Sequence, residues 1–84
     1  MRLTIHGPNL NDQSKGSFRV HAAGCADNGR EVRRNGSSYP FTDDFASRTE
    51  VAALIYADQI AESADDAAAY VSDFHFAPCC AALR

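Results

Sequence analysis

The chain has 84 residues and a net charge of −3, and 45% of its residues are hydrophobic, with no tryptophan. This length predicts one small domain, residues 1–84, with a thin core of the kind that often needs a metal, a disulfide or a partner. The sequence has no run of about 18 apolar residues and no signal-type start, which excludes a membrane span and predicts a cytoplasmic protein with reduced cysteines.

Charge is divided between the two halves of the chain. Residues 1–42 carry six basic and three acidic side chains, whereas residues 43–84 carry two basic and eight acidic ones. A domain that binds duplex nucleic acid usually has a strong basic excess, which this chain lacks.

Two segments near the N-terminus alternate apolar and polar residues. They cover residues 3–6 and 17–21 and are separated by turn-forming residues, so they predict a β-hairpin with a long loop. Residues 26–34 predict a short helix with a solvated face, although Gly29 disfavours it. Residues 39–41 are expected to be extended because of their proline.

The second half predicts helices. Ser47 and Glu50 have the spacing of a capping box, which predicts a helix over residues 48–62 with Val51, Leu54 and Ile55 on its buried face. A second N-cap at residues 63–66 predicts another helix as far as residue 73. We therefore expect an α+β domain in which the N-terminal hairpin packs on two or three short helices.

One pattern of histidine and cysteine occurs twice. His21 and Cys25 are separated by three residues, as are His75 and Cys79, and the two pairs stand 54 residues apart. Two imidazoles and two thiolates form the ligand set of a tetrahedral structural zinc site. Such a closed site would tie the hairpin to the C-terminus and stabilise the fold. Gly24 is expected to ease the turn that brings Cys25 beside His21, and Pro78 is expected to give a rigid turn before Cys79. The alternative is that the cysteines are small buried residues and the histidines lie on the surface.

Two further residues could compete for this site. Cys79 and Cys80 point in different directions from an extended backbone, and the repeated spacing selects Cys79 as the ligand. Cys79→Ser is therefore expected to weaken folding more than Cys80→Ser. His6 could lie near His21, but we expect it to be a partly exposed strand residue.

The two ends of the chain resemble small proteins encoded by actinobacteria and their phages. The resemblance is carried by Phe18-x-Val20-His21-x-x-Gly24-Cys25 and by residues 70–79. It implies a phage accessory protein that acts on a host factor, and it carries no catalytic residues with it.

Other signals for catalysis are weak. Residues 5–11 are similar to the N-terminal segment of type II dehydroquinases, but the match ends within seven residues. Glycine, proline and asparagine in this order are also residue types that commonly form a turn. Adjacent carboxylates at Asp43–Asp44 and Asp65–Asp66 are expected to act as helix caps. A hydrolase would need an open zinc with three protein ligands, whereas four matched ligands predict a closed one. We therefore expect no enzyme.

The predicted function is that of a non-enzymatic, zinc-stabilised interaction protein that binds a host protein. The expected contact surface is acidic and comprises Asp58, Glu62, Asp65 and Asp66. The same charges could instead serve only solubility. The alternative function is a small nucleic-acid-binding regulator that uses Arg19, Arg30, Arg33 and Arg34.

Overall fold

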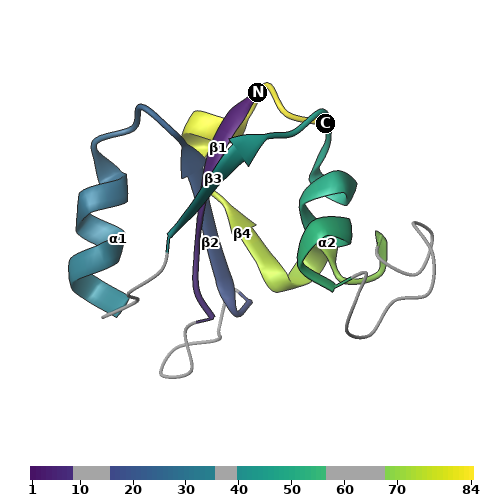
Figure 1. Cartoon of the computed structure of the whole chain (residues 1–84), viewed down its shortest axis with the longest axis horizontal. Helices are drawn as coiled ribbons and strands as arrows, with labels where there is room; N and C mark the ends of the chain where they lie inside the picture. Colours follow the sequence, from purple (N-terminus) through teal and green to yellow (C-terminus); the bar gives the residue numbers. More distant parts are fainter. Residues whose placement is uncertain (9–15, 36–39, 57–67) are drawn as a thin grey trace.

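The computed structural model describes residues 1–8, 16–35, 40–56 and 68–84, with the backbone alone at 34 and 35 (Figure 1). Its four strands, β1 (Arg2–His6), β2 (Phe18–Ala22), β3 (Phe41–Asp44) and β4 (Phe74–Phe76), form one sheet in the order β3-β1-β2-β4. β1 pairs antiparallel with β2 and with β3, while β2 pairs parallel with β4. The hairpin segments are therefore the two central strands of a larger sheet.

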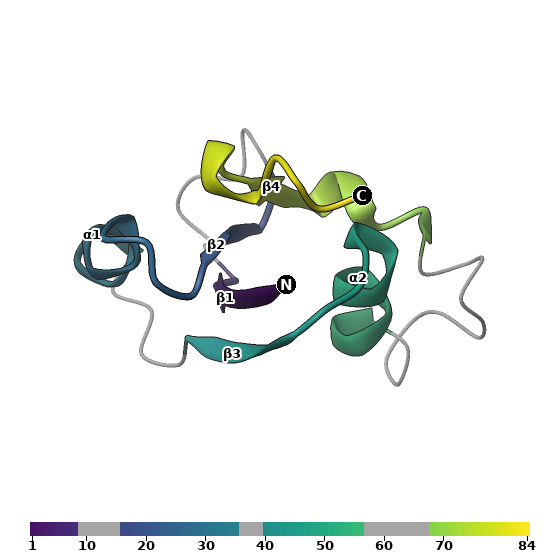
Figure 2. The same cartoon turned by 90° about the horizontal axis from the view of Figure 1, so that it is seen from above.

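In the part of the chain that the structure describes, two helices and two 3-10 turns accompany the sheet. The helices are α1 (Asp27–Asn35) and α2 (Arg48–Tyr56), and the turns are η1 (Val71–Asp73) and η2 (Pro78–Cys80). Figure 2 shows α1 and α2 on opposite sides of the sheet. The predicted α+β class is confirmed. Within the described ranges, no helix is long and apolar enough to cross a membrane.

The edge strands β3 and β4 were not predicted. β3 carries four exposed side chains, and it becomes a strand because the outer edge of β1 supplies its backbone partners. The helix predicted as far as residue 73 does not extend that far: residues 71–73 form η1, and the chain enters β4 at Phe74. Phe74 stacks on Phe18 at a ring distance of 4.8 Å, so tertiary packing decides the strand. The N-cap predicted at residues 63–66 lies outside the described residues.

The start of α2 agrees with the predicted cap. The Ser47 hydroxyl accepts the Glu50 amide at 3.1 Å, and the Glu50 carboxylate accepts the Ala46 amide at 3.1 Å, one residue earlier than a capping box requires. Val51 is fully buried as predicted, but Leu54 is 47% exposed. The buried face of α2 is formed by Val51 and Ala52, which turns Leu54 outward. The predicted continuation over residues 57–62 lies outside the described part.

The C-terminal segment is tied to the sheet by the backbone itself. The Ala77 amide donates to the Val20 carbonyl at 3.0 Å, which continues the contact of β4 with β2. Arg48 donates its amide to the Arg84 carbonyl at 2.6 Å and its Nε to the Leu83 carbonyl at 3.2 Å. These bonds tie the C-terminal segment to β2 and to the start of α2.

The two faces of the central strands differ in chemistry. One face is apolar and forms the core with α2; its main residues are Leu3, Ile5, Phe18, Val20, Phe74, Val51 and Ala52. The other face carries Thr4, His6, Arg19 and His21, all of them buried. A polar face of an antiparallel pair normally meets water, but α1 packs on this one. The result is a buried polar layer between α1 and the sheet.

Candidate metal centre

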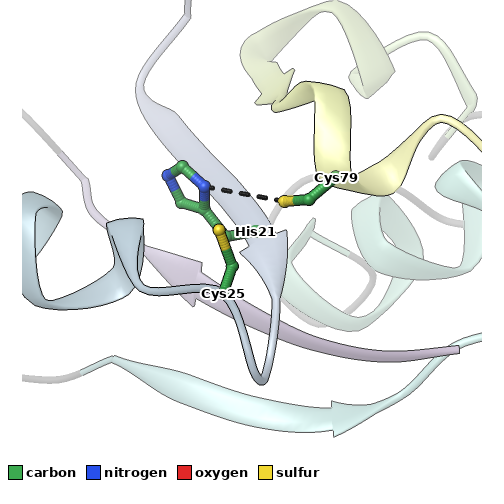
Figure 3. A group of neighbouring side chains, drawn as sticks. All are labelled: His21, Cys25 and Cys79. Carbon is green, nitrogen blue, oxygen red and sulfur yellow. Dashed lines mark hydrogen bonds between the residues drawn. The ribbon is translucent and has the colours of Figure 1, made fainter.

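Three of the four predicted ligands lie together at one end of this polar layer (Figure 3). His21 comes from the end of β2, Cys25 from the turn before α1, and Cys79 from η2, and their ligand atoms all lie within 4.8 Å of one another. The His21 Nδ1 and the Cys79 Sγ are 3.8 Å apart. In a tetrahedral zinc site with bonds of about 2.0–2.3 Å, the donor atoms stand roughly 3.5–3.8 Å apart. The His21–Cys79 pair therefore has the spacing of a tetrahedral site, and the three ligand atoms, all within 4.8 Å of one another, are close enough to hold a metal ion after a small approach.

The turn at the end of β2 brings Cys25 to the cluster. The Cys25 amide donates to the Ala22 carbonyl at 2.9 Å, and the Asn28 side chain donates to the Ala22 and Ala23 carbonyls at 2.9 and 3.2 Å. We expected Gly24 to ease this turn, but a Cβ at this position would meet no atom within 4 Å. The hydrogen bonds of Asn28 hold the turn, and this residue was not predicted as part of the site.

Cys79 is placed by η2 and by the end of β2. Pro78 begins the 3-10 turn, which confirms its role as a rigid start, and the Ala22 amide donates to the Cys79 sulfur at 3.2 Å. The same strand therefore supplies the imidazole ligand and a hydrogen bond that holds the Cys79 sulfur beside it.

The electrostatics of the Cys25 thiol depend on its neighbours. The backbone of Asp27 donates to the Cys25 sulfur and lowers the pKa of this thiol, but desolvation and the adjacent Cys79 thiol raise it more, and the pKa lies above its ordinary value. Two neighbouring thiols resist losing both protons. A divalent cation between them would remove this conflict, because a coordinating thiol is deprotonated by the metal.

Glu31 supports His21 from the opposite side of the ring. The His21 Nε2 lies 3.3 Å from a carboxylate oxygen of Glu31, and both side chains are buried. No described residue makes a hydrogen bond to this nitrogen. A histidine that binds metal through one nitrogen usually directs the other at a carboxylate, which fixes the ring. The arrangement therefore leaves Nδ1 for a metal and assigns Nε2 to Glu31.

Glu31 was not predicted as part of the site, because the helix expected over residues 26–34 was assigned a solvated face. Asn28 and Glu31 are three residues apart and lie on one face of α1, and both contact the polar layer. The signal in the sequence is the absence of an apolar stripe: the one large apolar residue, Val32, is 39% exposed. A helix of this composition can pack only on a polar surface.

His6 is buried and belongs to the same layer. It is 1% exposed, its Nε2 lies 2.8 Å from the Asn28 Oδ1, and its ring centre is 5.9 Å from that of His21. The prediction of a partly exposed residue is wrong, because α1 covers this part of the sheet. His6 stands outside the cluster and holds Asn28, which in turn holds the Cys25 turn.

His75 and Cys80 do not join the cluster. His75 pairs in register with Arg19, so it stands two residues behind the level of His21, or about 7 Å along the strand. Cys80 is fully buried, and its thiol donates to the Val20 carbonyl at 3.5 Å. Burial and the neighbouring Cys79 raise the pKa of Cys80 to about 11, so it is a neutral thiol at pH 7. The structure thus places Cys79, and not Cys80, at the site.

The other predicted binding residues have different positions. Asp58, Glu62, Asp65 and Asp66 lie outside the described residues, so the acidic contact surface stays a prediction. Arg19 is buried, and its guanidinium donates to the Gly16 carbonyl at 2.9 Å, so its assignment to a nucleic-acid surface is wrong. Arg30 is exposed and lies 3.4 Å from the Asp27 carboxylate. Arg33 is also exposed on α1.

An open apolar cavity of about 530 Å³ lies on the α2 side of the sheet. Two of its lining side chains, Phe41 and Leu54, are 43% and 47% exposed. The full lining is Gly7, Pro8, Phe18, Phe41, Leu54, Ile55 and Tyr56. Exposed large apolar side chains around a hollow are typical of a surface that binds another molecule.

Comparisons with known proteins do not assign the chain to a family. No protein-family model, no curated protein and no solved structure matches it.

Proposed function

We propose that this chain is a small, non-enzymatic interaction domain in which His21, Cys25 and Cys79 hold a zinc ion. The observation that carries the proposal is the convergence of these three side chains, with Glu31 behind the imidazole. Two thiolates and one imidazole are soft and borderline donors, which favour zinc over calcium or magnesium. The site would join the end of β2, the start of α1 and η2.

The role proposed for the metal is to stabilise the fold. His21 and Cys79 are 58 residues apart in sequence, so a bond through the metal closes a long loop. Because the unfolded chain holds no preformed site, the free energy of metal binding adds to the free energy of unfolding. A domain of 84 residues has a thin core and gains from such a link.

The proposed partner is a protein segment with an apolar side chain flanked by basic residues. The apolar side chain would enter the cavity beside Phe41 and Leu54. The basic residues would face the exposed Asp43 and Asp44 of β3. The resemblance of the chain ends to actinobacterial and phage proteins supports a host protein as this partner.

Nucleic-acid binding is the weaker candidate. Arg19 is buried, Arg30 lies beside Asp27, and the net charge of −3 gives little attraction to phosphate.

Elemental analysis tests the metal part of the proposal. Protein purified without chelator should contain about one zinc per chain, as one four-coordinate site requires. Folded, metal-free protein that takes up no zinc would contradict it. The partner part is tested by capture from a host lysate with Leu54→Asp and a matched control, Val32→Asp. Both side chains are exposed, but Val32 lies on α1 and does not line the cavity, so only Leu54→Asp should reduce capture. Equal capture by both variants would exclude the cavity as the docking site.

A further inference from the structure

The cluster supplies three ligands to a metal that prefers four. Within the described residues, the grouping of ligand atoms ends with His21, Cys25 and Cys79. Nearby donors are directed elsewhere: the Cys80 thiol faces the Val20 carbonyl, and the Asp27 carboxylate lies 3.4 Å from Arg30. Structural zinc sites use four protein ligands, whereas sites with three keep one position for water or another ligand.

Among the described residues, the remaining position would lie on the more exposed side of the cluster. The His21 imidazole is buried against α1 and approaches the cluster from the sheet, while Cys25 is partly exposed and Cys79 is exposed. In a tetrahedral site the other three ligands all point away from any one of them, so the fourth position lies on the same side of the metal as the two sulfurs.

We propose that the metal in this site keeps its fourth position open and exchanges a bound water for a small neutral nitrogen donor of the imidazole type. This inference rests on the proposed metal binding. Two thiolates and a neutral imidazole cancel the charge of a divalent ion, so a neutral donor leaves the site neutral. An anionic donor would add a negative charge to a site whose imidazole already lies 3.3 Å from the Glu31 carboxylate.

Cobalt(II) in place of zinc makes this position visible. The full chain is loaded with cobalt in a buffer that contains a phosphine reductant to keep the thiols reduced. Its visible absorption spectrum is then recorded during titration with imidazole and, in a separate sample, with azide. We expect imidazole to shift the bands in a saturable way while cobalt stays bound through dialysis, and azide to act only at much higher concentration. His75→Ala should show the same shift as the wild-type chain, because His75 stands at the level of Arg19 and not of His21.

The outcomes separate this inference from the metal site itself. Failure of the chain to bind cobalt would contradict the proposed function. Cobalt bound with a spectrum that imidazole does not change would leave the metal site standing and overturn the open position. A shift seen only in His75→Ala would show that His75 closes the site, which also overturns the inference. A stronger response to azide than to imidazole would overturn the choice of a neutral ligand.

Discussion

Serine substitutions at the adjacent Cys79 and Cys80 should separate metal binding from packing. Cys79 is exposed and lies in the His21 cluster, so Cys79→Ser should change the stability of the metal-free protein by no more than about 0.5 kcal/mol. Cys80 is fully buried, so Cys80→Ser places a hydroxyl in the core and should cost on the order of 1–3 kcal/mol with or without metal.

The difference between the variants lies in the effect of zinc. At free zinc 100 times the dissociation constant, binding stabilises the folded state by about 2.7 kcal/mol. For a domain of this size, this corresponds to a rise in melting temperature of roughly 10–20 °C. The wild-type chain and Cys80→Ser should show this rise, and Cys79→Ser should lose most of it. The larger loss expected from the sequence for Cys79→Ser therefore applies to the zinc increment, whereas in metal-free protein the buried Cys80 makes Cys80→Ser the more costly change.

Thermal melts in a phosphine reductant, with zinc and with chelator, measure these increments directly. Each variant serves as its own reference, so a general loss of stability does not imitate loss of the metal. A full zinc increment in Cys79→Ser would refute the assignment of the ligand. An equal melting temperature of the wild-type chain with zinc and with chelator would refute the stabilising role of the metal.

Three further predictions follow from separate contacts. Glu31→Gln should weaken zinc affinity by about 10- to 100-fold in a competition titration with a chelator dye, because it removes the carboxylate behind His21, and an unchanged affinity would exclude that role. Tyr56 donates a hydrogen bond to Asp73, and burial and this carboxylate raise the pKa of Tyr56 above its ordinary value of 10.0. The folded state thus favours the protonated phenol, so the free energy of unfolding should fall as the pH rises above 10. In urea unfolding at several pH values, Tyr56→Phe should show a smaller fall than the wild-type chain. Equal pH dependence of the two proteins would contradict this. Charge reversal at Glu62 and Asp65 should weaken capture of a basic partner with little change in melting temperature, and tight binding of duplex DNA at physiological salt would instead support the nucleic-acid alternative.

Local rules were sufficient where a few neighbouring residues determine the structure. The Ser47 cap, the fully buried Val51 and the turn at Pro78 follow from short-range hydrogen bonding and ring geometry, and the structure contains each of them. The edge strands depend on partners far along the chain. β3 pairs with residues about 40 positions earlier in the sequence, and β4 pairs with residues more than 50 positions earlier. A local sequence pattern therefore does not predict these two strands.

The candidate site shows the same division. His21 is the next-to-last residue of β2, and the turn after Ala22 brings Cys25 back to it. His75 is likewise the next-to-last residue of β4, but it pairs with Arg19 and so lies two residues short of the level of His21. Equal spacing in the sequence therefore does not give equal geometry, because the register of β4 against β2 sets the position of His75 along the sheet.

The buried polar layer explains why a metal would suit this fold. His6 and His21 each have a buried ring nitrogen with no hydrogen bond from the described residues, and such a group costs on the order of 1–3 kcal/mol. Alternation along β1 and β2 directs these side chains away from the apolar core, and α1 then covers them. An apolar face would pack at lower cost. Zinc on the His21 Nδ1 would polarise the ring and strengthen its interaction with Glu31, so the polar layer would lose part of its cost when the metal binds. The same side chains that weaken the metal-free fold would thus make its stability depend on the metal.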